Sequence, residues 1–228
     1  MVNAASSAGG GHLEELPLLV QEVLGSLSLR PADIGEFGVV TGPGGFTGLR
    51  IGVSFISTMA SLVGAEVVPL NALDLLAAEV VAVRGSTGPG TAVLVVVDGR
   101  RNEVFWGLYL PMGGVLERLG ESHTRPEDLA AEGLAGILDG SVERLLVAGS
   151  GLDRYAERIQ FPAGLEAVDT GVRAASDVTV ASTYARLSME DSRVPANGVE
   201  IVYLRGADAV AKFGSPAGSN EGKEPSGQ

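Results

Sequence analysis

The chain has 228 residues, and its 28 Asp and Glu outnumber its 16 Lys and Arg, which gives a formal net charge of −12. A protein this acidic is not expected to bind duplex DNA or an anionic membrane by itself. The absence of cysteine excludes disulfides, thiolate metal sites and a catalytic thiol, and leaves the cytoplasm as the default location.

The first 27 residues divide into a loop-like start and an amphipathic helix. Residues 1–11 are small and glycine-rich, without the basic region or long apolar run of a secretory signal, so we expect a flexible N-terminus. Apolar residues then recur at spacings of three and four, which predicts a helix with one apolar face. They are Leu13, Leu16, Val20, Val23 and Leu27.

A strand, a glycine-rich loop and an apolar helix follow. The β-branched run Phe37–Thr41 leads into Gly42-Pro43-Gly44-Gly45-Phe46-Thr47-Gly48, and Leu49–Val63 carries only one charge, on Arg50. A helix that is apolar on all sides must be covered on more than one face, so we expect a second polypeptide to shield it. Serines interrupt the apolar window Val53–Leu70, which therefore matches a membrane span poorly.

The rest of the chain alternates strands and helices, which predicts an α/β protein. The best boundary is Arg84–Gly90, where Gly, Ser, Thr and Pro gather, so we expect an N-terminal lobe over 12–90 and a C-terminal lobe over 91–213. Residues 214–228 have the composition of a disordered tail. We predict strands at Glu66–Pro69, Thr91–Val97, Glu103–Leu110, Arg144–Ala148 and Glu200–Leu204, and helices at Ala72–Val83 after an Asn71 N-cap, Thr124–Leu138 after a capping box, Asp153–Ile159 and Ser176–Met189.

The glycine-rich loop between a strand and a helix has two interpretations. Backbone N–H groups at such a helix start form a phosphate cradle, and a nucleotide-dependent kinase or a peptidase would use Gly42–Gly48 in this way. The loop lacks the Lys-Ser/Thr pair of a Walker loop and the G-x-G-x-x-G spacing, and a tight turn that packs a helix onto a sheet explains it equally well.

Metal and hydrolytic sites find little support in the sequence. His12 and Glu15 share a helix face, but Leu16 occupies the next position on that face and the only other histidine is His123. There is no G-x-S-x-G motif. We therefore predict neither catalytic residues nor metal ligands, and no cofactor bound by this chain.

Three motifs occur in the order seen in one known family. GPGGFTGLRIG (Gly42–Gly52), VVDGRRNEVFWGLY (Val96–Tyr109) and EIVYLRGADAV (Glu200–Val210) resemble the TsaB (YeaZ) family of bacterial tRNA threonylcarbamoyladenosine biosynthesis proteins. The resemblance is strong over about residues 11–110. It implies a degenerate two-lobed fold of the actin-like ATPase (ribonuclease H-like) superfamily.

The resemblance also implies a function and partners. Members of this family are non-catalytic scaffolds that pair with the catalytic subunit TsaD and recruit the ATPase TsaE, and the complex transfers threonylcarbamoyl to adenosine 37 of tRNA. ATP and metal are then expected on the partner subunits, and tRNA is reached only through the complex. The family's partner interface uses the first two helices; the matching residues here are Leu13, Leu16, Val20, Val23, Leu49, Gly52, Val53, Ile56 and Ala60. A homodimer that uses the same helices is the alternative.

One departure from the family pattern concerns the start of the chain. Family members begin with a hairpin and a third strand before the first helix, whereas about eleven loop-like residues precede it here. We therefore expect a first lobe without these strands, which leaves Val39, Val40 and Val67 short of neighbours.

Overall fold

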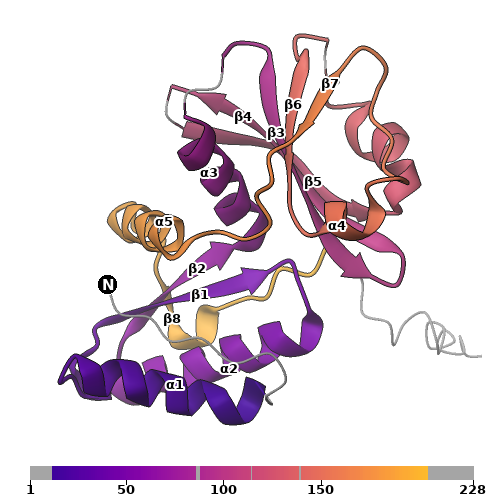
Figure 1. Cartoon of the computed structure of the whole chain (residues 1–228). Coiled ribbons are helices and arrows are strands. Elements are labelled where there is room, and N and C mark those ends of the chain that lie inside the picture. The colour runs from indigo at the N-terminus through magenta and orange to yellow at the C-terminus, as the bar shows by residue number, and fades with distance from the viewer. Residues whose placement is uncertain (1–11, 86–87, 114, 139, 205–228) are drawn as a thin grey trace, which may run out of the picture.

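The computed structural model describes residues 12–85, 88–113, 115–138 and 140–204, and within them the chain forms two β-sheets covered by helices (Figure 1). The first sheet has three strands in the order β1-β2-β8, and the second has five in the order β5-β4-β3-β6-β7. The α/β class expected from the sequence is confirmed. The predicted flexible start (1–11) and tail (214–228) lie outside the described residues.

The strand, glycine loop and helix predicted near residue 40 are confirmed. Strand β1 (Glu36–Gly42) leads into α2 (Phe46–Val63), which returns the chain to β2 (Glu66–Asn71). The two strands are parallel, with Val39 opposite Pro69. Gly64 ends α2 in the left-handed conformation that glycine adopts without steric cost.

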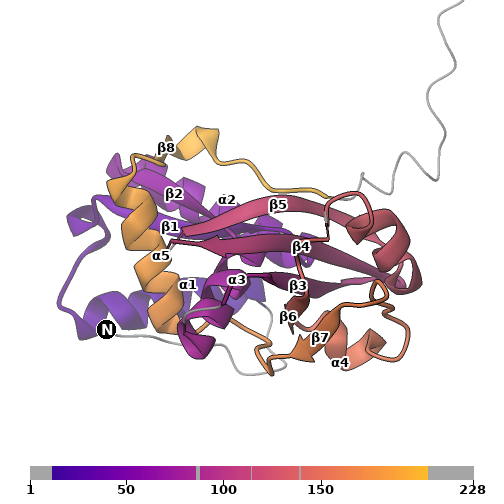
Figure 2. The same cartoon turned by 90° about the horizontal axis from the view of Figure 1, so that it is seen from above.

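Helices cover both faces of the three-stranded sheet. Helix α2 packs on one face, around buried Val39 and Val67, and α1 (His12–Ser26) lies beside α2 (Figure 1). Helix α5 (Asp177–Met189) lies across the opposite face, where its residues pack on Val68 and Leu70 (Figure 2).

The centre of the second sheet is buried on both faces. Its central strand β3 has five consecutive residues, Ala92–Val96, with no exposed surface. Strand β3 pairs antiparallel with β4 and parallel with β6. The strands of this sheet are β3 (Thr91–Arg100), β4 (Glu103–Met112), β5 (Val115–Thr124), β6 (Arg144–Ala148) and β7 (Glu166–Asp169).

Helix α3 (Ala72–Arg84) connects the two sheets. The side chain of Asn71 accepts from the backbone N–H groups of Leu73 and Asp74, which confirms the predicted N-cap. Leu73 and Val80 join the core on the second sheet, whereas Leu75 packs with β2. The boundary at Arg84–Gly90 stays a prediction, and α3 contributes to the cores on both sides of it.

The Thr124–Leu138 helix predicted from a capping box is wrong. Thr124 ends strand β5, and its hydroxyl donates to Glu132. A 3₁₀ turn, η2 (Pro126–Asp128), and a π-helical turn, η3 (Leu129–Leu134), follow instead of a continuous α-helix. The π turn brings Gly133 against the ring of Trp106, where an added Cβ atom would lie 3.1 Å from the ring and would force a small shift of it.

Further differences concern short elements. Helix α4 (Gly151–Tyr155) begins earlier than predicted, and β8 (Val194–Pro195) was not expected. Because β8 pairs with β2, Val67 has neighbours on both sides, contrary to the sequence expectation. The remaining 3₁₀ turns are η1 (Pro31–Asp33) and η4 (Ala196–Gly198).

Candidate partner interface

The Gly-Pro turn between β1 and α2 packs tightly against the last described segment of the chain. Gly42 has a φ of +119°, and a Cβ atom there would lie 3.0 Å from the carbonyl oxygen of Val202. The backbone N–H of Val202 donates to the carbonyl of Thr41 at 2.9 Å. Glycine is therefore required at position 42 both by the backbone angle and by this close approach.

The segment 200–204 is irregular, so the strand predicted there is wrong. Instead, it brings a second family motif onto the first. The rings of Tyr203 and Phe46 lie 5.6 Å apart at 42°, and both side chains are about half exposed. Residues from Gly42–Gly52 and from Glu200–Val210 thus meet at the start of α2.

Arg50 completes this cluster. Its guanidinium carbon lies 4.2 Å above the centre of the Phe46 ring, and its Nε donates to the Tyr203 hydroxyl at 3.4 Å. A cation above an aromatic ring is attracted to the ring's negative face, so the two aromatic side chains hold the guanidinium in one place. We call these three residues the Phe46–Arg50–Tyr203 cluster.

Helix α2 presents much of its surface to solvent. Only Val53 and Ala60 are buried, and both pack on the first sheet. The other predicted partner-binding members of this helix, Leu49, Gly52 and Ile56, are half-buried. These last three are therefore partly open to solvent, while Val53 and Ala60 fix the helix to the first sheet.

Helix α1 extends this surface. From Glu15 to Ser26 none of its residues is buried, and Leu16, Val20 and Val23 are half-buried. Leu18 is exposed. The side chain of Leu13 lies outside the described part. We call these residues of the two helices the α1–α2 surface. They are Leu16, Leu18, Val20 and Val23 of α1 and Leu49, Gly52 and Ile56 of α2.

Length and composition alone would let α2 cross a membrane, with 11% of the helix buried. The core helix of a soluble protein passes the same test, but such a helix is mostly buried. Helix α2 joins two parallel strands of one sheet and packs on them, as the connecting helices of α/β folds do.

The glycine-rich loop residues that the sequence singles out lie around this cluster. Pro43 is buried and follows a cis peptide bond, whereas Thr47 and Gly48 are exposed on the first turn of α2. No Cβ at Gly48 or Gly52 would contact another atom within 4 Å, so the helix surface is open there. Another backbone can approach closely at these two glycines.

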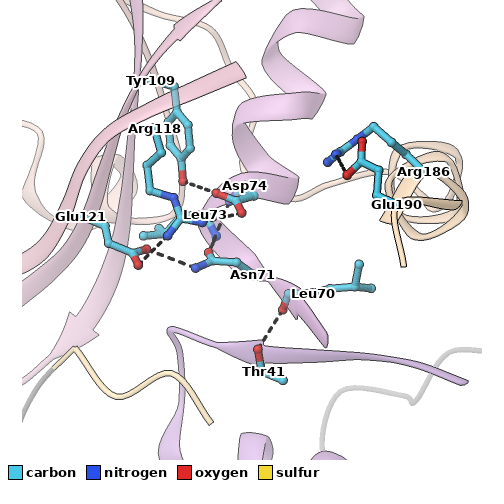
Figure 3. Close-up of polar contacts among 10 residues, drawn as sticks. All are labelled: Thr41, Leu70, Asn71, Leu73, Asp74, Tyr109, Arg118, Glu121, Arg186 and Glu190. Atoms are coloured by element: carbon cyan, nitrogen blue, oxygen red, sulfur yellow. Dashed lines mark hydrogen bonds and ion pairs between the residues drawn. The ribbon is translucent and has the colours of Figure 1, made fainter. Parts of the chain in front are cut away.

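A polar network that sequence reasoning did not find links α3 to the second sheet (Figure 3). The Tyr109 hydroxyl donates to one oxygen of Asp74 at 2.8 Å, and Arg118 binds the other at 2.6 Å. Arg118 also pairs with Glu121, which accepts from Asn71 at 3.1 Å. Burial, and then the neighbouring Asp74 carboxylate, raise the pKa of Tyr109 well above its ordinary value, so its hydroxyl remains a donor.

This network forms one end of a cavity of about 720 Å³ between α3, the β4–β5 strands and α5. Arg186 and Glu190 of α5 pair with each other at its other end (Figure 3). The sequence signal for the network was Asn71, predicted as the N-cap of a helix; the contacts themselves could not be foreseen, because Tyr109 and Arg118 come from strands distant in sequence.

Within the described ranges, no group of three or more His, Asp or Glu side chains is placed to hold a metal ion. His123 lies on β5, with its Nδ1 buried and without a hydrogen-bond partner there. For His12 the structure describes the backbone but not the side chain.

Comparison with known proteins agrees with the fold. Residues 6–185 match the profile of the family described as TsaD, tRNA N6-adenosine threonylcarbamoyltransferase. The tRNA threonylcarbamoyladenosine biosynthesis protein TsaB of Bacillus subtilis is 27% identical over 195 residues, which are 85% of this chain and 80% of that protein. Escherichia coli TsaB is 32% identical over 98 residues, 43% of this chain and 41% of that protein.

A solved structure shows the same relationship. YeaZ from Pseudomonas aeruginosa superposes with a TM-score of 0.67 at 25% identity, covering 84% of each chain. The resemblance drawn from the three motifs is therefore confirmed. The chain belongs to the TsaD family of tRNA N6-adenosine threonylcarbamoyltransferases and is homologous to its TsaB (YeaZ) members.

Proposed function

We propose that this chain is a non-catalytic scaffold subunit of the complex that forms threonylcarbamoyladenosine at position 37 of tRNA, and that it pairs with a TsaD-type catalytic subunit through the α1–α2 surface. The relatives' names support the role in threonylcarbamoyladenosine biosynthesis. In this proposal, TsaE, ATP and metal join through the partner, and the complex acts in the cytoplasm.

One observation carries the choice of surface. Helix α2 has a single charge in 18 residues, yet only two of its residues are buried. Apolar surface left open to this extent is typical of a site that another protein covers. Tyr and Arg are also, with Trp, the side chains most enriched where protein interfaces concentrate their binding energy, and Phe is enriched at interfaces in general.

The net charge supports an indirect contact with tRNA. At −12, the chain repels a phosphate backbone, which binds proteins through Lys and Arg. The partner subunit would therefore hold the nucleic acid. The acidic chain would contribute to binding only by positioning that partner.

Gly52 offers a direct test of the pairing. A Cβ atom at this position would have no neighbouring atom within 4 Å, so we expect Gly52→Gln to leave folding intact while its side chain extends into the space that a partner helix would occupy. Gly136→Gln, on an exposed turn of the other lobe that is equally open, is the matched control. The measurement is co-elution with the TsaD-type subunit of the same organism in size-exclusion chromatography.

We expect the wild type and Gly136→Gln to co-elute with that subunit and Gly52→Gln to elute alone. Failure of the wild type to co-elute would reject the pairing. Co-elution of all three would place the interface elsewhere on the chain. Light scattering on the isolated chain tests the alternative, because a homodimer that Gly52→Gln dissociates would assign the α1–α2 surface to self-association.

A further inference from the structure

Arg50 is fixed in place before any partner binds. The Phe46 ring lies beneath its guanidinium, and the Tyr203 hydroxyl accepts from Nε. These contacts use one face of the guanidinium and one of its five donors. Within the described part of the chain, the four donors on the two terminal nitrogens have no hydrogen-bond partner, and the side chain is exposed. An arginine held in this way loses little side-chain entropy when it forms a further contact.

Arg50 differs from most surface arginines of the chain in having no carboxylate partner within the part of the chain that the structure describes. Ion pairs are formed by eight others: Arg30, Arg118, Arg144, Arg154, Arg158, Arg173, Arg186 and Arg193. Carboxylates are abundant, with 28 acidic residues in the sequence, yet none of those that the structure describes ion-pairs with this guanidinium. Arg50 is the one charged residue of α2, so no acid on its own helix can pair with it.

A partner that covers α2 also removes water from Arg50. Burying a guanidinium is strongly unfavourable unless a charge of opposite sign accepts its hydrogen bonds. A carboxylate fits best, because its two oxygens match the two parallel N–H groups of the guanidinium. A phosphate of a nucleic acid would also fit, but the net charge of −12 opposes its approach.

We infer that the partner presents an aspartate or glutamate side chain to Arg50, and that the Phe46–Arg50–Tyr203 cluster is the anchor that sets the partner's register along α2. This inference rests on the proposed function for the identity of the partner. It adds that the partner must carry a carboxylate, and that this carboxylate must face Arg50. An apolar partner surface at Arg50 would contradict it.

The test is an affinity series at Arg50, measured by titration calorimetry with the TsaD-type subunit of the same organism. Arg50→Lys keeps the charge but loses the two parallel donors, Arg50→Leu removes the charge, and Arg50→Glu reverses it. We expect affinity to fall in that order, by about tenfold for Lys, at least about thirtyfold for Leu and more than about a hundredfold for Glu. The control is Arg125→Glu, at an exposed position on the other lobe, which alters the net charge by the same amount as Arg50→Glu. It should leave the affinity within about threefold of the wild-type value.

Tyr203→Phe separates positioning from charge. It removes only the acceptor for Nε and keeps the ring on Phe46, so we expect affinity to fall a few fold with an unchanged urea midpoint. Unchanged midpoints across the Arg50 series would exclude a merely structural role. An Arg50 series in which the midpoint falls in step with affinity would overturn the inference.

The outcomes distinguish this inference from the proposed function. A wild type that does not bind the TsaD-type subunit rejects both. If the wild type binds and Gly52→Gln does not, while Arg50→Leu binds as well as the wild type or more tightly, the pairing stands and the carboxylate contact is rejected. Tighter binding by Arg50→Glu would reject it too, because the partner would then carry a basic group. If tRNA alone binds the wild type and loses affinity in the same series, the anion is a phosphate and the inference is wrong.

Discussion

The central strand β3 of the second sheet and the edge strand β1 of the first are both short, β-branched runs, but their surroundings differ. Strand β3 is paired on both sides, and five of its residues have no exposed surface. Strand β1 pairs only with β2 among the described residues, and Val40 is exposed. The second sheet is thus completed by its own chain, whereas the first sheet and its helices retain surface that a partner can cover.

The same contrast holds for leucines on the two sides. Leu94 on β3 is fully buried, whereas Leu62 at the end of α2 is 76% exposed. Leu94→Ala should lower the free energy of unfolding by about 3 kcal/mol, because it removes buried carbon atoms and leaves a cavity. Leu62→Ala should change it by less than about 0.5 kcal/mol. Urea denaturation of both variants measures the difference, and similar losses would mean that α2 is already covered in the isolated chain.

Asp74 tests how firmly α3 is fixed to the second sheet. Asp74→Ala leaves the buried Tyr109 hydroxyl without its hydrogen-bond acceptor, and it leaves Arg118 with Glu121 as its one remaining ion-pair partner among the described residues. We expect a loss of about 2 kcal/mol, mostly from the unsatisfied hydroxyl. Adding Tyr109→Phe removes that hydroxyl, so the double variant should be no less stable than Asp74→Ala. A double variant whose loss equals the sum of the two single losses would show that the two side chains act independently.

Much of the first sheet could be predicted from the sequence, because its elements carry local signals. The β-branched run before Gly42, the helix with one charge and the Asn71 N-cap each specify their structure within a few residues. Strand β5 could not be predicted, since it lies at a sheet edge and its residues VLERLGESHT show no clean alternation of buried and exposed positions. The Thr-Arg-Pro-Glu sequence at its end then indicated a helix N-terminus that tertiary packing overrides.

The candidate interface shows the same limit. Phe46 and Arg50 share a turn of one helix, so the sequence could place them together. Tyr203 is 153 positions from Arg50, and its motif predicted a strand rather than a contact with α2. What holds the cluster together is the hydrogen bond between Val202 and Thr41, a long-range contact that no local pattern encodes.

The smallest effect concerns the contact between α5 and strand β1 of the first sheet. Glu36 at the start of β1 accepts from the Tyr184 hydroxyl at 2.6 Å and from Ser188 at 2.7 Å. The bonds from Tyr184 and Ser188 lower the pKa of Glu36 below its usual value of 4.5. Burial, together with this carboxylate, raises the pKa of Tyr184 from 10.0 to about 12.

Tyr184→Phe should therefore cost about 1 kcal/mol near neutral pH and change the pH dependence of stability at both ends. In the wild type, the Glu36 contribution is present above pH 4.5 and is lost as the pH falls through its lower folded-state value. The Tyr184 contribution is present below pH 10 and is lost as the pH rises through about 12. Urea midpoints measured across these pH ranges should fall less at alkaline pH, and less at acidic pH, in Tyr184→Phe than in the wild type. Ser188→Ala is the control: it should lose stability at alkaline pH as the wild type does, because Tyr184 and its acceptor Glu36 both remain. If Ser188→Ala reduces this alkaline loss of stability and Tyr184→Phe does not, Tyr184 does not hold α5 on β1.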